Sequence, residues 1–136
     1  MVAALPPAPA TGVVRFAALL LLCSAYILGP ITKIFDFPGA IAEMTHFGLS
    51  PPAVFAVVVI VFELAATAMI LANKGRGLAA LGLAGFTLFA TCIALRFWEA
   101  PAGPERMMAM HAFFEHLGLI GGFLMVALDD RARKKG

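Results

Sequence analysis

Four long stretches of the chain are almost free of charged residues, and short polar segments separate them. They lie near residues 13–31, 52–72, 78–98 and 107–128. A bilayer core requires about 20 apolar residues in helical form, so each stretch is long enough to cross it. The pattern therefore predicts an all-α integral membrane protein built as a bundle of four transmembrane helices.

The second stretch combines a β-branched run, Val57–Val61, with one acidic residue, Glu63. A lone strand in lipid would leave its backbone groups unpaired, so we expect a helix here. A central acidic residue costs about 2.5–3.5 kcal/mol on insertion, whereas each Leu, Ile, Val or Phe returns about 0.3–0.6 kcal/mol. Eleven such residues between Val54 and Leu71 still favour insertion, although narrowly.

The connection 32–51 is too long to be structureless in a small domain. Pro38–Gly39 is a turn signal, and apolar residues then recur with helical spacing as far as Gly48. Glycine suits a helix end, and Pro51 prevents the helix from continuing. We expect a short interfacial helix in this first outer loop.

Composition and charge limit the class of protein. The chain has 136 residues, of which 62% are hydrophobic and 13% charged, and its net charge is +2. These values exclude a disordered chain and a fibre, and two cysteines are too few for a disulfide framework. The basic residues are too sparse to form a phosphate-binding face, so we expect no nucleic-acid partner.

The distribution of Lys and Arg predicts the orientation, because cytoplasmic loops carry the excess of basic residues. Seven lie on the side of the two termini and three on the other side, which places both termini in the cytoplasm. The seven are Arg15, Lys74, Arg76, Arg131, Arg133, Lys134 and Lys135, and the three are Lys33, Arg96 and Arg106.

Three segments follow from this division of the chain. Residues 1–12, rich in Pro and Ala, are expected to be a flexible lead-in. Residues 13–128 form the membrane domain. Residues 129–136 form a basic cytoplasmic tail, which we expect at the inner headgroups.

Several short segments, in order, resemble the DoxX family of small bacterial inner-membrane proteins over about residues 13–128. They are Gly29, Lys33 and Asp36, then 46–51 (HFGLSP), Glu63–Leu64, Gly75–Gly77 (GRG), Phe97–Trp98, and 114–122 (FEHLGLIGG). The resemblance implies a four-helix protein of the bacterial inner membrane. The family takes its name from a subunit of a terminal quinol oxidase, and relatives are associated with thiosulfate:quinone oxidoreduction and with complexes that handle thiol and oxidative stress.

The resemblance thus implies an accessory subunit of a redox or oxidative-stress complex rather than a stand-alone enzyme. Its expected partners are the lipid bilayer and either a redox protein or a second copy of the chain. The family offers no catalytic set to transfer, so candidate sites are argued from the residues themselves.

Polar residues within the spans are concentrated in the predicted outer half of the bundle. The five are Glu63, Arg96, His111, Glu115 and His116. Charged groups within a span nearly always face protein or water, so Arg96 is expected to pair with Glu63 or Glu115. His111 and Glu115 share a helix face, whereas His116 is turned about 100° away.

Two interpretations of this cluster remain open. It can line a cavity for the headgroup of a quinone, where His and carboxyl groups supply hydrogen bonds and carry protons. It can equally be a structural ion-pair network that fixes helix register and meets no ligand.

Other functions find less support in the sequence. Met107, Met108 and Met110 with His111 and Glu115 resemble ligands for Cu(I), but Met is an ordinary residue at the end of a span, and we expect no metal site. Cys23 and Cys92 lack the Cys-x-x-Cys spacing of thiol chemistry. A small proton-coupled exporter would explain a single membrane Glu, but such exporters carry it in the first span and have a weaker charge bias.

Overall fold

The computed structural model describes residues 9–135, and every regular element in them is helical. The elements are α1 (Pro9–Phe35), α2 (Phe37–His46), α3 (Pro52–Leu71), α4 (Arg76–Ala94), the short 3-10 helix η1 (Phe97–Glu99) and α5 (Pro104–Lys135). Helices α1, α3, α4 and α5 are each long and apolar enough to cross a membrane. The predicted all-helical fold with four membrane helices is confirmed.

Several helix ends differ from the predicted ones, including the end of α1 at Phe35 and the start of α5 at Pro104. Helix α1 already includes residues 9–12, which were expected in the lead-in, and residues 1–8 lie outside the described part of the chain. Helix α5 continues through the basic tail to Lys135. Helix α4 ends at Ala94 rather than near residue 98, because Phe97 and Trp98 leave the helix to pack against α5. Their rings lie 5.4 and 5.8 Å from that of Phe113.

The predicted helix in the 32–51 connection is confirmed as α2. The Asp36 carboxylate accepts a hydrogen bond from the Gly39 amide at 3.1 Å and so caps the first turn. Pro38 and Gly39 therefore lie inside this turn instead of preceding the helix. At the other end Gly48 has φ of +75°, a conformation that glycine adopts without strain.

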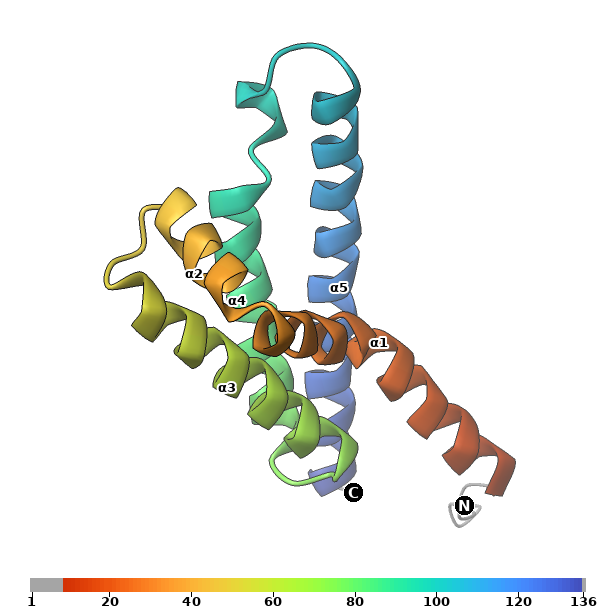
Figure 1. The fold of residues 1–136 in the computed structure, drawn as a ribbon. Helices are drawn as coiled ribbons and strands as arrows, with labels where there is room; N and C mark the ends of the chain where they lie inside the picture. The colour runs from red at the N-terminus through yellow and green to blue at the C-terminus, as the bar shows by residue number, and fades with distance from the viewer. Residues whose placement is uncertain (1–8, 136) are drawn as a thin grey trace.

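The helices form two groups that pack against each other (Figure 1). Helices α4 and α5 form an antiparallel hairpin, and α1 and α2 pack on α3. Tyr26 of α1 contacts Phe123 of α5 edge to face, with ring centroids 5.3 Å apart. Phe123, Ile70 and Leu83 are fully buried, so residues of α3, α4 and α5 share one core.

The start of α1, the turn after α3 and the end of α5 lie together at one end of the bundle, here called the termini end (Figure 1). Helix α2 and η1 lie toward the opposite end, here called the α2 end. This arrangement agrees with the expectation that both termini share one side of the membrane.

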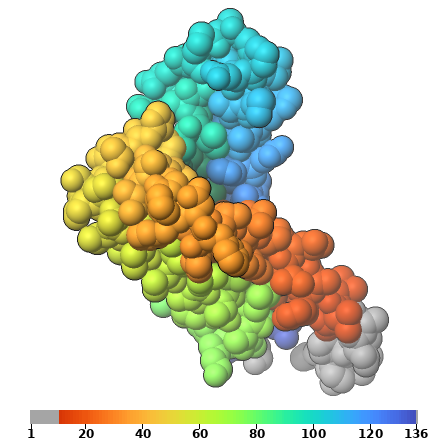
Figure 2. All heavy atoms as spheres, viewed as in Figure 1, coloured from red at the N-terminus to blue at the C-terminus, as the bar shows by residue number. Residues whose placement is uncertain are grey.

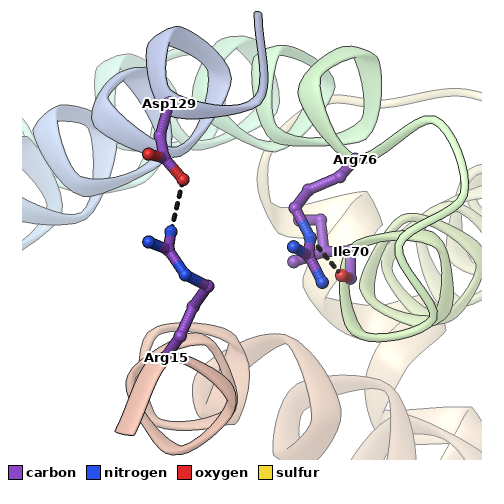
Figure 3. Close-up of polar contacts among 4 residues, drawn as sticks. All are labelled: Arg15, Ile70, Arg76 and Asp129. Atoms are coloured by element: carbon purple, nitrogen blue, oxygen red, sulfur yellow. Dashed lines mark hydrogen bonds and ion pairs between the residues drawn. The ribbon is translucent and has the colours of Figure 1, made fainter. Parts of the chain in front are cut away.

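Polar contacts at the termini end join neighbouring helices, both within the α4–α5 hairpin and between the two groups. The Asp130 carboxylate accepts a hydrogen bond from the Gly77 amide at 3.0 Å and so caps the start of α4. Arg76 Nε donates to the Ile70 carbonyl at 2.8 Å, and Arg15 forms an ion pair with Asp129 (Figure 3). The first two contacts involve helix-end groups, the Gly77 amide at the start of α4 and the Ile70 carbonyl at the end of α3.

Replacing Asp130 with Ala is expected to lower the thermal unfolding midpoint in detergent by several degrees, because α4 loses its cap. Asp129→Ala is the matched control, since its ion pair with Arg15 is half-exposed and exposed pairs contribute little. Circular dichroism of both variants measures the difference. Equal midpoints for the two variants would contradict the capping role of Asp130.

Candidate functional site

A cavity of about 520 Å³ lies between the two groups of helices, toward the α2 end. The surface is hollowed where α1 and α2 meet the α4–α5 hairpin (Figure 2). Its walls are mostly apolar and include the aromatic rings of Phe47, Phe55, Phe86 and Phe89. This volume is within the range of about 300–1,000 Å³ that is typical of small-molecule sites.

The carboxyl group of Glu63 reaches this cavity from α3. The side chain is only 6% exposed, and among residues 9–135 its carboxyl has no hydrogen-bond or ion-pair partner. Gly29 of α1 lies directly opposite, since a Cβ at this position would be 3.3 Å from Glu63 Oε2. The missing side chain of Gly29 therefore makes room for the carboxyl group. A buried polar group without a partner is costly, so Glu63 is available to a ligand.

Tyr26 lines the cavity, and the direction of its hydrogen bond to Thr87 is fixed. Thr87 Oγ1 donates its single hydrogen to the Leu83 carbonyl at 2.6 Å. The Tyr26 hydroxyl is hydrogen-bonded to the same Thr87 oxygen, so Tyr26 must be the donor. The phenolic oxygen then keeps its lone pairs for other partners.

The same reasoning assigns the tautomer of His116, which lines the cavity from α5. Thr91 Oγ1 donates to the Thr87 carbonyl at 2.6 Å and lies 3.0 Å from His116 Nδ1. Because the Thr91 hydrogen is already used, Nδ1 of a neutral His116 must carry the proton and donate it to Thr91. Nε2 is then a bare acceptor.

Three of the polar groups around the cavity therefore present acceptors. They are the Tyr26 oxygen, His116 Nε2 and the carboxyl oxygens of Glu63. A ligand that donates hydrogen bonds from a flat apolar body complements this set best.

Lys33 and Glu43 also line the cavity, and the sequence analysis did not select them. Lys33 shares one face of α1 with Tyr26 and Gly29, because these residues are three and four positions apart. This spacing, together with the fact that Tyr26 is the single tyrosine of the chain, is the sequence feature that could have identified Lys33 as a site residue. Glu43 gave no such signal, since it reaches the cavity only because α2 packs back onto α3.

Of the five predicted site residues, Glu63 and His116 both line the cavity, and the other three do not. His111 and Glu115 are exposed on α5. Arg96 borders a second, smaller cavity of about 250 Å³ beside His46. The expected pairing of Arg96 with Glu63 or Glu115 is wrong, because Arg96 forms its ion pair with Glu99 at 3.3 Å, three residues along the chain.

Within residues 9–135, no three His, Cys, Asp or Glu side chains lie close enough to hold a metal ion. Cys23 is buried and Cys92 is exposed, and both are free thiols.

Comparison with known proteins finds one family. The sequence profile of the DoxX family matches residues 14–96, which is more than half of the chain. No curated protein and no solved structure matches this chain.

The tautomer of His116 can be tested by ¹⁵N NMR at alkaline pH, where the imidazole is neutral. The wild type is expected to carry its proton on Nδ1, and Thr91→Val is expected to shift it toward Nε2 because the acceptor is lost. Exposed His111 is the internal reference and should not respond to the Thr91 change. A wild-type His116 with its proton on Nε2 would rule out the assigned hydrogen-bond direction.

Proposed function

The chain belongs to the DoxX family, and from this premise we propose that it is a membrane subunit of a redox complex that holds the headgroup of a quinone in its cavity. The observation that carries the proposal is the buried Glu63 carboxyl, which faces an apolar cavity without a partner in the described chain. Polar groups within a membrane are functional-site candidates when nothing in the protein pairs with them.

The reduced form of the ligand, a quinol, fits the three acceptors of Tyr26, Glu63 and His116 better than the oxidised form, for which Lys33 is the donor in the lining. A quinol donates hydrogen bonds from two hydroxyl groups, whereas a quinone offers only carbonyl acceptors. His116 Nε2 and the Tyr26 oxygen are acceptors, so they complement hydroxyl groups. The aromatic rings of Phe86 and Phe89 give the flat ring of the ligand apolar neighbours.

The proposed role is that of a binding subunit. Oxidation of a quinol to a quinone releases two electrons and two protons. Glu63 and His116 are groups that can accept protons, and the electrons pass to an electron-accepting partner subunit of the complex. The chain itself then supplies the site, the orientation of the ring and the exclusion of water.

Titration of decylubiquinol and decylubiquinone into the protein in lipid nanodiscs tests this proposal by calorimetry under inert gas. The quinol is expected to bind more tightly than the quinone. His116→Ala and Glu63→Gln are each expected to weaken quinol binding about five- to tenfold, the effect of losing one hydrogen bond in a buried site.

The chain offers a matched control for each variant. Glu115→Gln and His111→Ala change the same residue types outside the cavity, so both should bind like the wild type. A wild type that binds neither form, or controls that lose as much affinity as the cavity variants, would disprove the role of the cavity.

We also propose that the protein lies in the bacterial inner membrane with both termini in the cytoplasm. Support comes from the excess of Lys and Arg at the termini end, where Arg15, Arg76 and Lys134 all lie. Basic residues near the ends of spans stay in the cytoplasm. In this orientation the cavity and α2 lie toward the periplasm.

Reporter fusions in bacteria test the orientation. Green fluorescent protein at the C-terminus is expected to fluoresce, and alkaline phosphatase at the same place to be inactive, because that enzyme folds only outside the cytoplasm. Alkaline phosphatase inserted within 100–103 is the opposite control and should be active. The reverse pattern would show that the orientation is inverted.

A further inference from the structure

We propose that two copies of this chain associate in the membrane through one face of α5, here called the α5 seam. Five exposed residues define it: His111, Phe114, Glu115, Gly118 and Gly121. Spacings of three and four residues place them in one stripe along the helix. None of these residues lines the cavity of the proposed function, so the inference does not depend on that function.

Glu115 of the α5 seam lies deep in the membrane, where contact between a carboxyl group and lipid is unfavourable. Asp130 marks the termini end of the bundle through its bond to the Gly77 amide, and Glu115 lies about 22 Å further along α5. The hydrocarbon core is about 30 Å thick, so the carboxyl group originates within it. Among the described residues Glu115 has no hydrogen-bond or ion-pair partner. Ionisable groups in a span nearly always face protein or water.

The seam is complementary to itself. His111 and Glu115 lie one helical turn apart, and one offers an imidazole while the other offers a carboxyl group. A two-fold axis parallel to the helices keeps equivalent residues at the same height, so His111 of each protomer meets Glu115 of its partner diagonally, about 6 Å apart along the axis, which makes two equivalent pairs. Such an arrangement is typical of isologous dimers. A second copy therefore supplies both missing partners at once.

Two glycines allow the close approach that this pairing needs. A Cβ added at Gly118 or at Gly121 would have no atom of the protomer within 4 Å. Small residues of this kind let two membrane helices approach closely. Gly122, in contrast, is used within the protomer, because a Cβ there would lie 2.9 Å from Leu22 of α1.

The seam leaves the cavity free. His116 and Leu119 line the cavity from α5. His116 is turned about 100° away from Glu115, and Leu119, four residues after Glu115, lies between the seam and the cavity. A dimer formed through the seam therefore keeps both cavities open.

The experiment measures dimerisation in liposomes by energy transfer between labelled copies at a fixed protein-to-lipid ratio. Replacing both Gly118 and Gly121 with Ile is expected to reduce the dimer population at least about tenfold, and Glu115→Gln about three- to tenfold. Gly85→Ile is the matched control, because Gly85 is an exposed helical glycine of α4 with equally open surroundings. It should leave dimerisation unchanged.

Cysteine cross-linking identifies the face and keeps the test valid if an Ile variant fails to fold. In a Cys92→Ala background, Gly118→Cys is expected to cross-link between copies, and Val61→Cys, exposed on α3, is not. A wild type that stays monomeric, preferential cross-linking at Val61, or equal loss of dimer in Gly85→Ile would each overturn the proposal. Cross-linking of Gly118→Cys to a different polypeptide in place of a second copy would also overturn it.

Discussion

The structure depends on one constraint: a polar group inside the bilayer has no water to bind and must find its partner in protein. Thr87 and Thr91 meet the constraint by donating to carbonyls of their own helix, and they then serve as acceptors for Tyr26 and His116. Glu63 and the Thr67 hydroxyl do not meet it within the described chain. Both lie on one face of α3, where Glu63 lines the cavity, whereas the exposed Glu115 of α5 lies outside it.

The two groups of helices leave the cavity between them toward the α2 end. At the termini end, the Arg76–Ile70 hydrogen bond and the Arg15–Asp129 pair link the two groups, and Asp130 holds α5 to the start of α4. Toward the other end, α2 packs on α3 rather than filling the gap, and Gly29 adds no side chain to it. The cavity is therefore a product of the way the helices are connected, and its apolar walls follow from the membrane-spanning composition.

The membrane helices and α2 could be predicted from the sequence because the length and hydropathy of each stretch, and the residues at its ends, determine a helix without reference to distant parts of the chain. It also selected Glu63 and His116 as candidate site residues, since polar groups in spans are conspicuous, and both line the cavity. It could not predict which face of α5 points inward, because helical periodicity gives relative angles and not the absolute rotation. For this reason His116 was grouped with Glu115, and Arg96 was given a partner on another helix although Glu99 lies nearer along the chain.

The contacts at the termini end have a consequence for how a lipophilic molecule arrives. Arg76 bonded to the Ile70 carbonyl and Asp130 bonded to the Gly77 amide fasten the α3–α4 corner and α5 into one rigid joint. Separation of the helix pairs is then easiest at the far end, where fewer polar contacts oppose it. For the proposed quinol ligand, this predicts sideways entry from the leaflet next to α2, with the hydrocarbon tail left among the acyl chains.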